Sequence, residues 1–119
     1  MKQEILTIYV TEAGLETARI IGKELGEEAM TVRRTQLTPE MLDRATAVIF
    51  VGAMGICVRT IIPLVADKHT DPAVVCVDSA GRYVIPVLSG HVGGANELAR
   101  RLARRLGAEA VITTQSDGA

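Results

Sequence analysis

The sequence is poor in aromatic residues and has no tryptophan. Only Tyr9, Phe50 and Tyr83 are aromatic among 119 residues, although 48% of the residues are hydrophobic. The core must therefore consist of Val, Ile, Leu and Ala, which is typical of a buried parallel sheet covered by helices. The shortage of aromatic rings also leaves no stacking platform of the kind that binders of single-stranded nucleic acid use.

The chain also lacks a large net charge and a long apolar run. Its formal net charge is −1, whereas nucleic-acid-binding domains usually carry a strong basic excess. No apolar run reaches the roughly 20 residues of a membrane-spanning helix, and the N-terminus has no apolar signal core. We therefore expect a cytoplasmic protein that has neither nucleic acid nor a membrane as its partner.

Metal-ligating residues are scarce as well. Cys57 and Cys76 form no Cys-x-x-Cys motif, and the two histidines, His69 and His91, are far apart in the sequence. These spacings predict no metal site and no disulfide framework. Both cysteines lie in apolar stretches, so we expect buried, reduced thiols.

Apolar runs alternate with amphipathic segments along the whole chain. The patterns predict strands at 4–10, 29–34, 46–52, 74–78, 82–88 and 110–114, and helices at 11–26, 38–45, 52–65 and 93–107. Thr11 and Thr38 are the expected caps of the first two helices. This order predicts one Rossmann-like α/β domain over residues 1–119, with three layers, a mostly parallel sheet, helices on both faces and one antiparallel edge hairpin.

Three strand-to-helix turns contain glycine, and we expect them to meet at one edge of the sheet. They run from Thr11 to Gly14, from Gly52 to Arg59 and from Ser89 to Asn96. In open α/β sheets, ligands bind outside the carboxyl ends of the strands. Glycine lets a ligand approach the backbone, and the helix after each turn offers unpaired N–H groups to an anion.

The second turn does not have the spacing of a nucleotide-binding loop. "GAMGICVR" places its glycines as GxxG rather than GxGxxG, and the chain has no GxxxxGK[ST] motif. One interpretation is that Gly52 and Gly55 only shape the turn, and the other is that they let a ligand approach the backbone. Arg59 is either a ligand of a carboxylate, which its planar guanidinium suits, or a solvated helix residue.

His91 is the strongest candidate for chemistry because it lies in a glycine loop just before a helix. An imidazole there can transfer protons near neutral pH, although it can also be a loop residue that bonds its own backbone. Ser89 has no His and Asp partners at the spacing of a nucleophilic triad. His69, beside Lys68 and Asp71, is expected to be a surface loop residue.

Three motifs together resemble the N-terminal domain of the cobalt-precorrin-5A hydrolase family, which acts in the anaerobic route to cobalamin. They are "GAMGICVR", "DKHTDPAVVCVD" and "LSGHVGGAN", in the family's order between Gly52 and Thr114. This segment covers about half of the chain. The first fifty residues resemble the family only loosely.

The resemblance implies a substrate and a reaction. The family enzyme hydrolyses a δ-lactone on a cobalt-bound tetrapyrrole and releases acetaldehyde, with no cofactor besides the cobalt that the substrate carries. His91 would be catalytic, activating water or protonating the leaving oxygen, with N–H groups of the Gly93–Gly94 turn near the oxyanion. The residues expected to bind the substrate are Thr11, Gly52, Gly55, Arg59, Lys68, Ser89, Gly90, Gly93, Gly94 and Asn96.

The resemblance also implies a partner within the same enzyme. The family enzyme has a C-terminal domain, so we expect this chain to be the N-terminal domain of a longer protein. The sequence leaves open whether it forms a homo-oligomer. The alternatives are a non-catalytic binding module for carboxylated tetrapyrroles and an unrelated nucleotide-binding domain.

Overall fold

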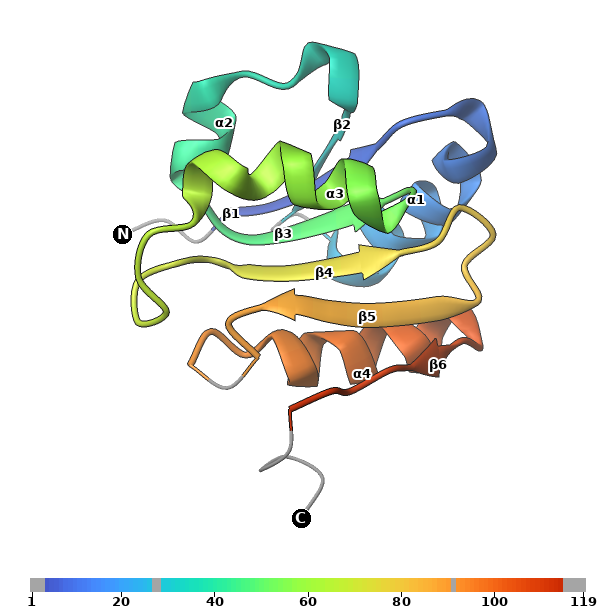
Figure 1. Ribbon diagram of the computed structural model, residues 1–119. Coiled ribbons are helices and arrows are strands. Elements are labelled where there is room, and N and C mark those ends of the chain that lie inside the picture. Colours follow the sequence, from blue (N-terminus) through green and yellow to red (C-terminus); the bar gives the residue numbers. More distant parts are fainter. Residues whose placement is uncertain (1–3, 27–28, 91, 115–119) are drawn as a thin grey trace.

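The computed structural model describes residues 4–26, 29–90 and 92–114 (Figure 1). Helices and strands alternate along most of the chain, as the sequence predicts. The elements are β1 (Glu4–Tyr9), α1 (Glu12–Leu25), β2 (Ala29–Arg33), η2 (Arg34–Gln36), α2 (Pro39–Arg44), β3 (Ala45–Val51), α3 (Met54–Ile61), η3 (Ile62–Leu64), β4 (Ala73–Val77), β5 (Tyr83–Leu88), α4 (Ala95–Leu106) and β6 (Glu109–Ala110).

The strands form one sheet in the order β2-β1-β3-β4-β5-β6. The first four strands in the chain are mutually parallel, whereas β5 is antiparallel to β4 and β6 is parallel to β5. We call the edge where β1, β3 and β4 end, at Tyr9, Val51 and Val77, the carboxyl edge. The amino edge is the opposite one, where β4 begins at Ala73 and β5 ends at Leu88.

Helices cover both faces of this sheet. On one face Ile21 of α1 and Leu102 of α4 are fully buried in one apolar cluster. On the other face Leu42 of α2 and Ile61 of α3 pack in a second cluster. The prediction of a three-layer, mostly parallel α/β fold is therefore confirmed (Figure 1).

The helix ends follow the sequence signals in part. Thr38 caps α2, because its Oγ1 accepts a hydrogen bond from the Met41 N–H at 3.3 Å. Thr11 is the N-cap residue of α1 as predicted, but its side chain makes no capping hydrogen bond, and its carbonyl accepts the Gly14 N–H at 3.0 Å. Pro63 lacks an N–H and cannot continue an α-helix, and α3 passes at that point into η3.

The predicted antiparallel pair is formed by β4 and β5, but β5 is not the outermost strand of the sheet. The short strand β6 pairs with Tyr83 and Val84, outside β5. The predicted strand over 110–114 is mostly wrong, because regular pairing stops at Ala110. Pro86 lies in the half of β5 that no described strand pairs on its outer side, which suits a residue without an N–H.

Candidate functional site

Two of the three predicted glycine turns meet at the carboxyl edge. A Cβ on Gly14 would come within 3.1 Å of Val51 Cγ1, and one on Gly52 would come within 2.9 Å of Val10 Cγ2. Both glycines are therefore explained by close packing between the turns that follow β1 and β3. Gly55 differs, since a Cβ there would meet nothing within 4 Å.

The third turn lies at the opposite edge, so the expectation that all three turns share a site is wrong. The residue that ends β5, Leu88, pairs with Val74 near the start of β4. Ser89 and the residues after it therefore leave the sheet at the amino edge (Figure 1). The cause is the antiparallel direction of β5, which reverses the edge at which its carboxyl end emerges.

At the amino edge the third turn meets the loop that carries the "DKHTDP" motif. Asp71 is buried, and its carboxylate accepts N–H groups of Ala66, at 2.9 and 3.2 Å, and of Asp67, at 3.0 Å. The Asp71 carbonyl in turn accepts the Ser89 hydroxyl at 3.2 Å. One aspartate thus shapes its own loop and links it to the loop of the "LSGHVGGAN" motif.

Ser89 organises the second loop. Its carbonyl accepts the N–H groups of Gly93 at 3.1 Å and Ala95 at 3.2 Å. Its φ of 59° is the one positive value at a non-glycine residue within the described ranges. Strained backbone of this kind persists where the surroundings over-determine it, and it clusters at functional sites.

The start of α4 completes this arrangement. Asn96 is buried, its N–H donates to the Gly90 carbonyl at 3.2 Å, and its Nδ2 donates to Thr114 Oγ1 at 2.8 Å. A Cβ on Gly90 would lie 3.0 Å from Asn96 Oδ1. Gly94 adopts φ 82° and is the residue before α4, a left-handed conformation that favours glycine.

The amino-edge site is defined here as the loops 66–72 and 89–96. It contains five of the predicted substrate-binding residues from the third turn and also the exposed Lys68. His91 lies outside the described residues. The sequence predicted that the N–H groups of Gly93 and Gly94 would lie near the oxyanion. The Gly93 N–H already donates to the Ser89 carbonyl, whereas the Gly94 N–H has no partner among the described residues. Of the two predicted oxyanion donors, only the Gly94 N–H is therefore left to donate to a ligand.

The remaining predicted residues lie elsewhere. Thr11, Gly52 and Gly55 lie at the carboxyl edge, away from the third turn. Arg59 is exposed on α3, the helix that leads from the carboxyl edge back towards the amino edge (Figure 1). The structure therefore does not bring the ten predicted substrate-binding residues together in one site.

The Cys57 thiol is not poised for reaction. Cys57 and Cys76 are free and buried, and Cys76 Sγ donates to the Gly52 carbonyl at 3.4 Å. A hydrogen bond with Cys76 and burial raise the pKa of the Cys57 thiol, so it stays protonated near neutral pH and is a poor nucleophile. The predicted buried thiols are confirmed.

Two further findings concern metals and membranes. Within residues 4–26, 29–90 and 92–114, no three His, Cys, Asp or Glu side chains are grouped so that they could hold a metal ion. No helix in this part of the chain combines the length and the apolar character needed to cross a membrane.

Sequence reasoning missed the role of Asp71. The signal was present, because an Asp directly before Pro72 in a short polar loop is a frequent turn former whose carboxylate bonds nearby N–H groups. Thr114 was missed too, since nothing in the sequence pairs it with Asn96, which lies eighteen residues earlier.

Comparison with known proteins agrees with this fold and with the motifs. Residues 36–117 match the family model described as Cobalamin synthesis G N-terminal. The chain belongs to this family. It is 61% identical over 72 residues to a cobalt-precorrin-5A hydrolase from Salmonella typhimurium, a match that covers 60% of this chain and 20% of that protein.

Two other relatives extend the match to nearly the whole chain. A cobalt-precorrin-5A hydrolase from Priestia megaterium is 40% identical over 131 residues, covering 92% of this chain and 34% of the relative. The crystal structure of a cobalamin biosynthesis protein G homolog from Sulfolobus solfataricus matches with a TM-score of 0.84 and 31% identity, covering 92% of this chain and 36% of the other. This member of the Cobalamin synthesis G N-terminal family thus spans between a fifth and about a third of the length of these relatives.

Proposed function

We propose that this chain is the N-terminal part of a cobalt-precorrin-5A hydrolase and that its amino-edge site takes part in opening the δ-lactone of the cobalt-bound tetrapyrrole. The single observation that carries the proposal is the 61% identity to the Salmonella typhimurium enzyme. We place its action in the cytoplasm, as the sequence predicts. The cobalt belongs to the substrate in this proposal, and no resident cofactor is invoked.

The amino-edge site suits part of this chemistry. Lactone hydrolysis requires a proton acceptor for the attacking water, and neutral imidazole at His91 can supply one. The neighbours of His91 in the chain belong to a loop that is braced by hydrogen bonds through Ser89 and Asn96. Bracing of this kind would let a residue in the loop act without a large reorganisation cost.

Substrate recognition would come from charge and from the open backbone. Lys68 is exposed in the loop that Asp71 shapes, where its ammonium group can meet a carboxylate of the substrate rim. Gly94, whose N–H has no partner among the described residues, directly precedes α4, where the helix dipole favours negative charge. Thr11, Gly52, Gly55 and Arg59 stay predictions as substrate ligands, but they would have to act from a second surface.

The test uses a chimeric protein, called the joined protein below, in which this chain is fused to the segment of the Priestia megaterium relative that follows the matched region. We expect the joined protein to release acetaldehyde from cobalt-precorrin-5A. His91→Ala should lower the rate at least about 100-fold. Met30→Ala is the control, because Met30 is 51% exposed on β2, at the other side of the sheet from this site, and it should change the rate less than about twofold.

The same variants separate catalysis from binding alone. A binding module would keep most of its affinity for the tetrapyrrole in His91→Ala and would release no acetaldehyde with or without the substitution. This alternative gains weight from the small share of its relatives that the chain covers. A folded joined protein that releases no acetaldehyde would overturn the hydrolase proposal.

A further inference from the structure

Several exposed apolar side chains belong to α3, η3 and β5. Within the described residues, eight large hydrophobic side chains are exposed, and Met54, Val58, Ile62 and Tyr83 are among them, with exposed fractions of 37%, 42%, 59% and 46%. Single exposed apolar residues are ordinary, whereas a contiguous apolar surface marks an interaction site. Their arrangement is therefore informative.

Met54, Val58 and Ile62 lie on one flank of α3 and its continuation η3. Residues spaced by four along a helix stack above one another. The opposite flank contains Thr60, whose hydroxyl oxygen accepts the Arg34 Nε–H at 2.9 Å from η2, beside β2. The Met54–Val58–Ile62 row therefore faces the other way, towards β4 and β5.

The α3-side face of β5 is apolar as well. Val84 packs under α1 and α4, and side chains of a strand alternate between its faces, so Tyr83 and Ile85 point to the α3 side. Val87 packs in the cluster beneath α2 and α3. In Figure 1 no helix of the described residues lies over β5 on this side, whereas α4 covers its other face. We define the apolar ledge as Met54, Val58, Ile62, Tyr83, Ile85 and Val87.

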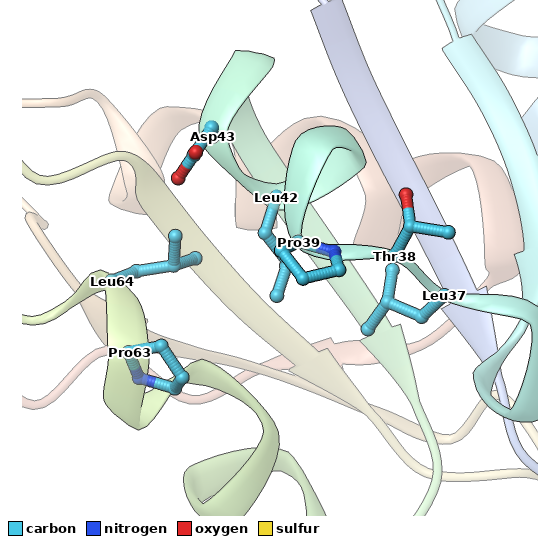
Figure 2. A pocket seen from close by; sticks show the side chains of 7 residues that line it. All are labelled: Leu37, Thr38, Pro39, Leu42, Asp43, Pro63 and Leu64. Carbon is cyan, nitrogen blue, oxygen red and sulfur yellow. The ribbon is translucent and has the colours of Figure 1, made fainter.

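A separate small apolar groove lies on the α2 side of η3 (Figure 2). It encloses about 270 Å³ between η3 and the start of α2, and apolar side chains form most of its walls. Its lining residues are Leu37, Thr38, Pro39, Leu42, Asp43, Pro63 and Leu64. Sites for small molecules usually measure about 300–1,000 Å³, so this groove better suits an anchoring side chain of a protein partner.

We propose that the apolar ledge is the docking surface for the C-terminal remainder of the cobalt-precorrin-5A hydrolase chain. The relatives are several times longer than this chain, which covers 20% and 34% of the two curated enzymes. The matched family model is the N-terminal one, so the extra length in those relatives follows this fold. The proposal depends on family membership and not on the reaction.

The path of the polypeptide favours this occupant over a second copy. After β6 the Val111 N–H donates to the Val84 carbonyl at 2.9 Å, so the segment beyond β6 still runs beside β5. Ile112 then packs with the α4 face and Thr114 accepts the Asn96 side chain, so in a relative with this fold the following polypeptide leaves beside β5 and the start of α4. A tether that starts there gives the remainder a high effective concentration at the ledge, which a second copy lacks.

Amide hydrogen exchange of the isolated chain and of the joined protein tests the proposal without substrate. We expect amides of Met54–Ile61 and Tyr83–Leu88 to exchange at least about tenfold more slowly in the joined protein, because docking suppresses local opening. Val58→Lys with Ile62→Lys should abolish the difference. Met30→Lys is the matched control, since Met30 is 51% exposed on β2 at the far edge of the sheet.

Two results would overturn the proposal. The first is equal exchange of α3 in the isolated chain and the joined protein. The second is a dimer of the isolated chain, seen by sedimentation, that the Val58→Lys and Ile62→Lys pair converts to a monomer, because the ledge would then bind a second copy. If the joined protein does not fold, the intact Priestia megaterium enzyme is compared with its own N-terminal segment in the same way.

Discussion

The two edges of the sheet use similar turn residues for different purposes. At the carboxyl edge Gly14 and Gly52 allow close packing against Val51 and Val10. At the amino edge the turns are held by polar groups, namely the carboxylate of the buried Asp71 and the hydroxyl and carbonyl of the half-buried Ser89. Packing needs only shape, whereas a braced polar loop with a strained serine is the arrangement expected of a site that performs chemistry.

The largest expected effect comes from removing the carboxylate that braces the amino edge. Asp71→Ala leaves the N–H groups of Ala66 and Asp67 without their acceptor, and we expect a loss of about 3 kcal/mol in the free energy of unfolding. Urea unfolding measures it. Asp67→Ala, in the same loop but exposed, is the control and should cost less than about 1 kcal/mol. If Asp71→Ala and Asp67→Ala lowered the free energy of unfolding equally, the buried Asp71 carboxylate would not be what holds the amino edge, and this contrast with the carboxyl edge would fail.

The next effect concerns space in the loop before α4. A Cβ at position 93 would lie 2.9 Å from Ser89 Cβ and 3.2 Å from Ser89 O, neither of which can move freely. Gly93→Ala should therefore cost about 2 kcal/mol through overpacking. Gly94→Ala meets no atom within 4 Å but keeps φ at 82°, so it should cost only about 1 kcal/mol. Thermal unfolding of both variants measures the order, and a smaller loss for Gly93→Ala would contradict this account.

Ser89 allows its hydroxyl and its backbone strain to be separated. Ser89→Ala removes the hydrogen bond to the Asp71 carbonyl but keeps the positive φ, and should cost about 1 kcal/mol. Ser89→Gly removes the same bond and relieves the left-handed conformation, so it should be more stable than the Ala variant by about 0.5–1 kcal/mol. Denaturant midpoints compare the two variants. An Ala variant as stable as the Gly variant would mean that the backbone at Ser89 is unstrained.

The smallest effect is expected at the carboxyl edge and has the opposite sign. A Cβ on Gly55 meets nothing within 4 Å, and Gly55 lies in the first turn of α3. Gly55→Ala should therefore raise the free energy of unfolding by about 0.5–1 kcal/mol through helix propensity. If Gly55→Ala stabilises the joined protein and keeps its full activity, glycine at position 55 is not needed for function. A loss of activity would give the carboxyl edge a part in substrate binding.

The fold was largely predictable because it depends on local patterns. Apolar runs and amphipathic helices have periods that a single sequence displays, and the short link at Ser79–Gly81 predicted the antiparallel pair. The location of the site was not predictable in the same way. The sequence indicated which turns contain glycine, but the direction of each strand in the finished sheet decides which turns are neighbours.

The sequence by itself determined the α/β class, the buried aliphatic core, the reduced cysteines and the motifs through which family membership is recognised. Only the tertiary structure decided that the turn after Leu88 meets the Asp71 loop rather than the Gly52 turn. The physical reason is that the hydrogen bond between Ser89 and the Asp71 carbonyl joins loops eighteen residues apart, and a contact of this kind has no local signature, although the short link Ser79–Gly81 indicated the direction of β5. The apolar ledge is a tertiary feature for the same reason, since it combines residues of α3, η3 and β5 that share one side of the sheet.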